Sequence, residues 1–353
     1  MNPTSIRYDA TALSHYATRL LQQAGLSESM APTVADTLVQ GDLLGHDTHG
    51  MALLAGYVKE LENGTMKREG APIVVSDRPA AVLWDGQRLP GPWLVHQGLD
   101  LLMQRARELG TASLVIRRSH HIACLAVYLL RALEDDMLLM LACSDPATAS
   151  VAPFGGTRAV FTPNPLALGF PLADGGVMVD ISASITTNGM SNRKHKAGEL
   201  FDEEWLIDAQ GKPTRDPAAL SAQQPGTLLP VGGLSHGHKG YGMALLVEAL
   251  TAGLAGHGRA DAPEGWGATV HLTLHDLQAF GGKAGFLRQM DHVAQQCRAT
   301  SGDAARPVRL PGERGLLRRA QQQSQGVQLH PSIAPSLQAA EQRYGLKLAD
   351  AQR

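Results

Sequence analysis

Residues 114–144 read LVIRRSHHIACLAVYLLRALEDDMLLMLACS, and this stretch decides the fold. It begins with the apolar run 114–116, continues with a helical pattern over 122–133, and ends with the apolar run 137–142, which leads to Ser144. Short apolar runs on either side of a helix predict an α/β unit. His121 directly precedes the predicted helix, so it and Ser144 lie at strand ends, where such folds place ligands.

Upstream of this unit the chain begins with helices and then changes to strands. Apolar residues at helical spacing predict three helices, which end at Gly25, Gly41 and Asn63-Gly64. The apolar runs that follow predict two strands, and a longer amphipathic pattern predicts one more helix; these elements cover 73–75, 81–84 and 94–109.

Downstream, residues 151–192 alternate short strands with turns, and the polar residues 193–236 predict loops over a surface. Gly240-Tyr241-Gly242 opens a strong helix, which is followed by a strand near 270–274. From about residue 284 the pattern is helical again, with Phe286, Met290, Val293 and Cys297 predicted on one face.

Helical ends around an α/β middle predict that the two termini pack together as one discontinuous domain. We therefore expect a helical domain built from residues 1–72 and 284–353. Residues 73–283 are expected to form an α/β cofactor-binding domain.

Composition limits the classes of partner. The chain has 353 residues, 44% of them hydrophobic and 18% charged, with a net charge of −2, so nothing favours nucleic acid or an anionic membrane surface. The polar start lacks a signal-like apolar core, and no apolar run reaches spanning length. Cys124, Cys143 and Cys297 lie far apart and are expected to be buried, reduced thiols of a cytoplasmic protein.

Three polar motifs are candidates for chemistry. Gly45-His46-Asp47-Thr48-His49-Gly50 and Ser119-His120-His121 supply imidazoles, and His238-Lys239-Gly240 supplies a cation beside flexible backbone. Together they suit proton and hydride transfer on an anionic substrate with a phosphorylated cofactor. Taken alone, each histidine is more often structural than catalytic.

The sequence contains neither the G-x-G-x-x-G signature after a strand nor a Walker A motif, so any cofactor binds by another geometry. Lys239 at a helix start suits a phosphate, because free N–H groups and the positive end of the helix dipole face the anion. A solvated lysine is the plainer alternative. Asp180 and Ser182 at a strand end suit a ribose or a phosphate, although a turn or capping role is equally natural.

A metal is not predicted. His46 and His49 are three residues apart and His120-His121 offers two more imidazoles, but no glutamate accompanies them as in H-E-x-x-H. No cysteine pair is available either. A metal-dependent hydrolase therefore ranks below an oxidoreductase.

The ordered set of motifs resembles the type 2 malate/L-lactate dehydrogenase family from about residue 8 to the end, and most closely its hydroxycarboxylate dehydrogenase B subgroup. The motifs that carry the resemblance include His46-Asp47-Thr48-His49-Gly50 with Tyr57, Ser119-His120-His121, Cys143-Ser144-Asp145-Pro146, Asn164-Pro165, Asp180-Ile181-Ser182, His238-Lys239-Gly240 and Pro311-Gly312-Glu313.

The resemblance implies a non-Rossmann, mixed-sheet cofactor domain beside the helical domain. It implies a homodimer whose interface helps form the active site. The implied activity is hydride transfer between NAD or NADP and small 2-hydroxy or 2-oxo acids. A cyclic imino acid reductase and a catalytically impaired cofactor-binding homologue are the alternatives on the same scaffold.

The resemblance also implies roles for individual residues. His121 matches the acid/base histidine, and His49 matches a histidine near the nicotinamide and the substrate. Positions that match cofactor contacts are Ala123, Cys124, Leu125, Ser144, Met178, Val179, Asp180, Ile181, Ser182, His238, Lys239, Gly312, Glu313 and Arg314. Thr48, Leu53 and His120 are the candidate substrate residues.

Two departures from the family pattern bear on the substrate. Most members carry an arginine at the Leu53 position, where it suits a bidentate grip on a carboxylate. Pro163 replaces a residue of the family's Gly-Thr-Asn-Pro segment and removes an N–H donor. The Leu53 position predicts a preference for an apolar side chain on the 2-oxo acid.

Overall fold

The computed structural model describes residues 6–303 and 305–353. Its centre is a seven-stranded mixed sheet in the order β1-β2-β3-β10-β4-β5-β6. The strands are β1 (Ile73–Arg78), β2 (Ala81–Asp85), β3 (Thr111–Ser119), β4 (Met137–Ser144), β5 (Pro165–Pro171), β6 (Gly176–Ser182) and β10 (Ala268–Asp276). Only β2 and β3 pair in parallel, and the other neighbours are antiparallel. This confirms the mixed α/β class and differs from the mostly parallel Rossmann sheet.

The predicted α/β unit within residues 114–144 is present, but a further strand lies between its two strands. β3 and β4 do not pair with each other, because β10 lies between them and pairs with both. α5 (Leu125–Glu134) connects the two strands and packs on β4 and β5. β10 is buried along most of its length, which explains its apolar sequence at Val270, Leu272 and Leu274.

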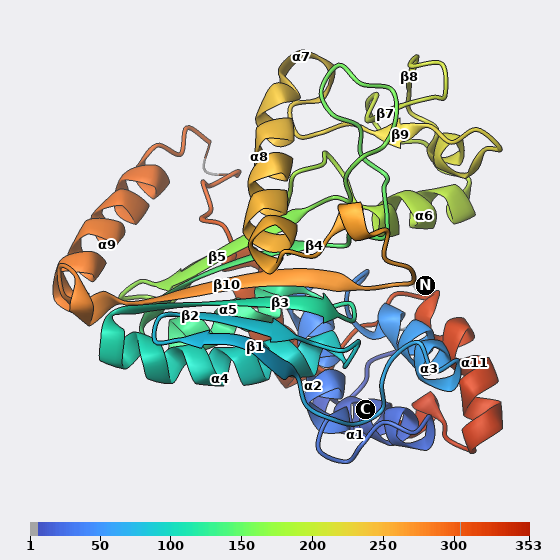
Figure 1. Cartoon of the computed structure of the whole chain (residues 1–353), viewed down its shortest axis with the longest axis horizontal. Coiled ribbons are helices and arrows are strands. Elements are labelled where there is room, and N and C mark those ends of the chain that lie inside the picture. Colours follow the sequence, from blue (N-terminus) through green and yellow to red (C-terminus); the bar gives the residue numbers. More distant parts are fainter. Residues whose placement is uncertain (1–5, 304) are drawn as a thin grey trace.

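Helices cover both faces of the sheet. α4 (Gly91–Leu109) and α5 lie on one face, while α8 (His238–Glu248) stands on the other (Figure 1). α8 continues into a π-helical turn, Ala249–Gly253, which contacts β3, β4 and β10. No helix within the described ranges is long and apolar enough to cross a membrane.

Helices from both ends of the chain share one layer beside the sheet (Figure 1). The N-terminal ones are α1 (Ala10–Gln23), α2 (Ala31–Leu44) and α3 (Leu54–Glu62), and the C-terminal ones are α10 (Glu313–Gln325) and α11 (Ile333–Tyr344). α10 packs on α2, and α11 packs on α1 and α3. Tyr8 forms β-bridges with Val327 and Gln352, which join the two ends of the chain.

α9 (Lys283–Ala299) departs from the expected division at residue 284. Its Phe286 and Met290 pack with Phe170 at the end of β5, away from the helical layer (Figure 1). Val293 and Cys297, predicted on the same helix face, are exposed. The periodicity predicts the helix correctly, but it does not predict where the helix packs. α9 follows β10 at the far end of the sheet and covers the end of β5 there.

The segment 193–236 was predicted as loops, and this is wrong in part. It holds the end of α6 (Asn188–Ala197), a short α7 (Gly233–His236) and a three-stranded sheet. The sheet strands are β7 (Leu206–Ile207), β8 (Pro213–Thr214) and β9 (Thr227–Leu228). A separate apolar core supports them, formed by Val151, Phe161, Ala183, Phe201, Leu206, Leu228 and Ala244. We call the region around this core, which includes α8, the small lobe. Strands of two residues are too short to show a sequence period.

Candidate active site

His121 lies in the turn between β3 and α5, and its ring is fixed at Nδ1. The Tyr57 hydroxyl from α3 lies 3.0 Å from His121 Nδ1 and donates to the His121 carbonyl at 3.2 Å. The backbone N–H of Ala123 lies 3.2 Å from the same Nδ1. Ala123 adopts a φ of 59°, a left-handed conformation that costs a non-glycine residue about 1 kcal/mol or more. Nε2 is therefore the nitrogen left to exchange a proton.

The turn at Ala123 also corrects one prediction about His121. The helix was predicted to begin at residue 122, but α5 begins at Leu125, after an extended Cys124. His121 is thus separated from the helix N-terminus. Burial is the main cause that lowers the pKa of His121 well below its usual range, and His49 and His120 act in the same direction. The imidazole is neutral at physiological pH because of desolvation rather than the helix dipole.

His49 lies against His121, with ring centroids 6.0 Å apart and an angle of 27° between the planes. Its Nδ1 contacts the Thr48 hydroxyl at 2.8 Å. Burial lowers the pKa of His49 to about 4, so this ring is neutral as well. The structure brings the two candidate catalytic histidines together, although 72 residues of sequence separate them.

The loop that carries His49 is anchored by a buried carboxyl group. Oδ2 of Asp42, near the end of α2, accepts the N–H of Met51 at 2.6 Å. A Cβ on Gly50 would lie 2.2 Å from the same oxygen, so only glycine allows the loop to pass this close. Burial raises the pKa of Asp42 to about 7. Asp42 had no distinguishing sequence signal, because one acidic residue in a helix is usually solvated.

Trp266 completes the aromatic surroundings of the site and was not predicted. Its ring centroid lies 4.6 Å from that of His121, 5.5 Å from that of Tyr57 and 5.3 Å from that of His120. It stands in the Gly265-Trp266-Gly267 segment before β10. A single tryptophan in a loop gives no periodic signal that could have identified it.

The three candidate substrate residues differ in how far the structure exposes them. Thr48 and Leu53 are partly exposed, and Leu53 packs against the main core from the short 3₁₀ helix Met51–Leu53. His120 is fully buried, and its Nε2 contacts Glu60 Oε2 at 3.2 Å. The role of His120 toward the substrate stays a prediction; in the structure its ring packs edge-on against Tyr57 and Trp266.

A pocket of about 470 Å³ gathers many of the predicted cofactor residues from segments far apart in sequence. Met178, Val179, Asp180 and Ile181 of β6 line it together with Gly312 and Arg314 at the start of α10. Leu44, Gly45, His46, Ala126, Pro311, Gly315 and Arg318 complete the lining. Its volume lies in the range of pockets that hold small molecules and cofactors, about 300–1,000 Å³.

The chemistry of this pocket fits part of a dinucleotide. The Asp180 carboxylate accepts the N–H of Ala126, in the first turn of α5, at 3.1 Å and has a second oxygen free for hydroxyl groups. Arg314 and Arg318 supply cations suited to phosphate. Gly312 has a φ of 91°, and a Cβ there would lie 2.7 Å from Met178 Cβ, so glycine lets α10 approach β6 and close the pocket.

Several predicted cofactor residues do not line this pocket. Glu313 pairs with Arg298, whose Nε donates to Glu313 Oε1 at 3.0 Å. Ser144 is buried, and its hydroxyl contacts that of Thr251 at 2.9 Å. Ser182 donates to the carbonyl of Ser184 at 2.7 Å. Each of these side chains thus has a protein partner in the structure, and their cofactor roles stay predictions.

The remaining predicted positions lie at the starts of two helices. Cys124 and Leu125 are buried at the start of α5, between His121 and the pocket. His238 and Lys239 form the first turn of α8, where the His238 ring lies 5.7 Å from Phe154 and Lys239 is exposed. Lys239 thus belongs to the small lobe, and the contacts described for it do not join it to His121.

Comparison with known proteins gives a consistent answer. Residues 8–338 match the family model described as malate/L-lactate dehydrogenase. Hydroxycarboxylate dehydrogenase B of Escherichia coli (strain K12) is 28% identical over 330 residues, which are 92% of this chain and 90% of the relative. A Delta(1)-pyrroline-2-carboxylate reductase of Ancylobacter novellus is 28% identical over 331 residues, 90% of this chain and 93% of the relative.

A solved structure supports the same assignment. The structure of a putative malate/lactate dehydrogenase from E. coli superposes with a TM-score of 0.89 at 26% identity, covering 98% of this chain and 97% of that one. The match extends through the helical layer, the mixed sheet and the small lobe. The chain therefore belongs to the malate/L-lactate dehydrogenase family.

Proposed function

We propose that this protein is a pyridine-nucleotide-dependent 2-hydroxycarboxylate dehydrogenase that interconverts 2-hydroxy and 2-oxo acids, with His121 as the acid/base. The observation that carries the proposal is the anchoring of His121 at Nδ1 by Tyr57 and Ala123, beside His49. Membership of the family supports the reaction class. The nicotinamide cofactor supplies the hydride acceptor or donor when bound.

Both protonation patterns of the His121 ring have a partner at Nδ1. When Nδ1 carries the proton it donates to the Tyr57 oxygen, while the Tyr57 hydroxyl donates to the His121 carbonyl. Nε2 then accepts the proton of a substrate hydroxyl. When the ring holds a second proton on Nε2 for a substrate carbonyl it is an imidazolium, and its Nδ1–H still donates to the Tyr57 oxygen. The anchor at Nδ1 thus suits an imidazole that accepts a proton in oxidation and returns it in reduction.

The pH dependence of activity follows from the lowered pKa of His121. The neutral ring, which accepts a proton during oxidation, is present above that pKa. We expect kcat/KM for 2-hydroxy acid oxidation to stay level through the usual histidine range near pH 6.5 and to fall only at lower pH. Reduction, which consumes a proton, should instead gain as the pH falls. Initial rates between about pH 4 and 9 test this; an acid limb at or above pH 6.5 for oxidation contradicts it.

We propose NAD or NADP as the cofactor, held along β6 and the start of α10. Asp180 suits ribose hydroxyls, whereas Arg314 and Arg318 suit a phosphate. The pocket therefore offers groups for either nucleotide. Lys239 is proposed to contact a phosphate or ribose of the same cofactor from the start of α8.

Lys239→Ala is expected to weaken cofactor binding more than it changes substrate preference. Loss of one exposed cation near a phosphate should raise the cofactor Kd by about two- to fivefold, because screened charge contacts contribute about 1 kcal/mol or less. Quenching of tryptophan fluorescence by NADH or NADPH measures the Kd. The matched control is Lys347→Ala, an exposed lysine near the C-terminus. An unchanged cofactor Kd with an altered substrate KM would move Lys239 to the substrate site.

We also propose a homodimer in the cytoplasm. The end of α8 and the turn after it expose Leu245, Leu246 and Leu254 at 47%, 49% and 59% of their surface. Three exposed leucines on one helical segment are suited to burial against a second copy. Light scattering after gel filtration measures the mass. The cytoplasmic location rests on the two buried cysteines, Cys124 and Cys143, which are free thiols.

The experiment that tests the whole proposal has two stages. The first titrates NADH and NADPH into the protein and follows fluorescence. The second screens apolar 2-oxo acids, dicarboxylic 2-oxo acids and cyclic imino acids for loss of reduced-nicotinamide absorbance. Turnover of a 2-oxo acid supports the proposal. Turnover of imino acids alone would indicate a reductase like the relative from A. novellus. Cofactor binding without turnover would indicate an impaired homologue, and no binding would overturn the proposal.

A further inference from the structure

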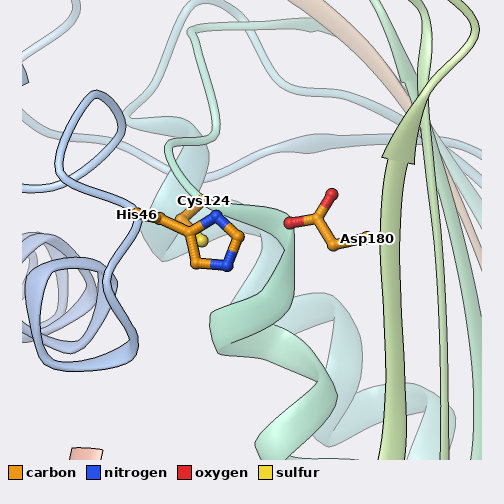
Figure 2. A group of neighbouring side chains, drawn as sticks. All are labelled: His46, Cys124 and Asp180. Atoms are coloured by element: carbon orange, nitrogen blue, oxygen red, sulfur yellow. The ribbon is translucent and has the colours of Figure 1, made fainter. Parts of the chain in front are cut away.

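Three side chains with metal-binding atoms lie together beside the cofactor pocket, and two of them, His46 and Asp180, also line it. His46 comes from the loop after α2, Cys124 from the N-cap of α5, and Asp180 from β6. One ligand atom of each lies within 4.8 Å of the others, and Figure 2 shows the imidazole and the carboxylate turned toward the sulfur. We propose that these three residues bind one zinc ion, with water as the fourth ligand.

The ligand set is suited to zinc. A thiolate, an imidazole and a carboxylate are ligands that Zn²⁺ takes in tetrahedral sites, with Zn–S near ~2.3 Å and Zn–N near ~2.0 Å. Those bond lengths require neighbouring ligand atoms about 3.5 Å apart, so the three groups must close by about 1 Å. His46 and Asp180 are only partly buried and line an open pocket, which leaves their side chains room for this change.

Charge also favours a divalent ion. A Zn²⁺ ion neutralises one thiolate and one carboxylate together, so the occupied site has no net charge. Binding would release the thiol proton. The Ala126 N–H, which holds one Asp180 oxygen, would orient the carboxylate from behind.

This ligand set differs from the one weighed in the sequence. The histidine spacing directed attention to His46, His49, His120 and His121, and no metal was predicted. Of these only His46 takes part, since His49 and His121 face each other in the catalytic centre. Cys124 and Asp180 lie 78 and 134 residues after His46, a separation that no short motif reveals.

The site has a functional consequence that rests on the proposed function. Asp180 and His46 also line the pocket assigned to the dinucleotide. One Asp180 carboxylate cannot ligate zinc and accept ribose hydroxyls at the same time. Zinc and nucleotide should therefore exclude each other, so that free zinc inhibits the enzyme competitively with the cofactor.

Cobalt substitution tests the metal site directly in the whole chain. Co²⁺ bound by a thiolate gives a charge-transfer band in the near ultraviolet, and we expect one Co²⁺ per chain with this band. Cys124→Ser should remove the band and weaken zinc binding by more than about a hundredfold, because even partners outside the ligand shell contribute ten- to a hundredfold. Cys297→Ser, at an exposed thiol that is not one of the three proposed ligands, is the matched control and should keep the band.

The outcomes are distinct. A band that disappears in Cys297→Ser, or zinc affinity that is unchanged in both Cys124→Ser and Asp180→Asn, overturns the site. If Cys124→Ser does not fold, wild-type protein without the thiolate band overturns it equally. NADH or NADPH should displace zinc from the wild type. If nucleotide binds while zinc stays, mutual exclusion is wrong. If the metal-free protein binds no nucleotide, the proposed function fails, and the cobalt spectrum still decides the metal site.

Discussion

His121→Asn is expected to lower turnover by about a hundredfold or more and to leave the Kd for the reduced cofactor within a few-fold of wild type. Loss of a positioned general acid or base costs about a hundred- to ten-thousandfold. Asparagine retains a polar side chain of similar reach, so the contacts with Tyr57 and Ala123 are altered less than by a larger change. Steady-state kinetics give kcat, and fluorescence titration gives the Kd.

The matched control for this variant is His292→Asn. His292 is exposed on α9, which packs at the far end of the sheet from His121. The control should keep both kcat and the cofactor Kd. A normal kcat in His121→Asn would remove His121 from the catalytic role. A loss of cofactor binding equal to the loss of kcat would instead assign His121 to the cofactor.

The parts of the fold that the sequence predicts are those with long periodic signals. α1 and α2 follow the predicted apolar stripes, and their ends at Gly25 and Gly45 have a positive φ, as glycine at helix ends commonly does. The predicted end of α2 at Gly41 is four residues early, because Gly41 is a helical position packed against Gly50. β10 was recognised as a strand, but its place between β3 and β4 is a long-range pairing that periodicity does not encode.

The sequence also predicted only part of the candidate site. The pair of His49 and His121 came from family motifs, and the structure places their rings in contact. Trp266, Asp42 and Glu60 were missed, because a lone tryptophan and two single acids in helical segments look like ordinary surface residues. The predicted substrate role of His120 stays a prediction: its motif drew attention to it, and the structure buries its ring beside Glu60.

The proposed cofactor pocket on β6 could not be predicted from short stretches of sequence. Asp180 was ambiguous between ribose binding and a turn role, and its sequence neighbours could not decide between them. The structure places α10 and the loop after α2 beside β6, and this arrangement supports the proposed ribose contact of Asp180. The same convergence creates the cluster of His46, Cys124 and Asp180. Neither grouping depends on sequence spacing, so both required the three-dimensional arrangement.

The predicted preference for an apolar substrate rests on Leu53, which stands four residues after His49. The family resemblance implies an arginine at this position in most members. Leu53 is partly buried against the main core and offers no charge for a second carboxylate. An unpartnered buried carboxylate costs several kcal/mol, whereas a methylene contact contributes only about 1 kcal/mol. Dicarboxylic 2-oxo acids such as oxaloacetate should therefore be poor substrates for the wild type.

Leu53→Arg should raise the ratio of kcat/KM for oxaloacetate to that for an apolar 2-oxo acid by about ten- to a hundredfold. The estimate follows from about 1.5–3 kcal/mol for a charged hydrogen bond, at 1.4 kcal/mol for each tenfold. Leu53→Met, which keeps an apolar side chain of similar volume, is the matched control and should leave the ratio unchanged. Thermal unfolding of each variant separates a change in specificity from a loss of packing. A wild type that already prefers oxaloacetate would contradict this account of the pocket, since the carboxylate would then have a partner other than residue 53.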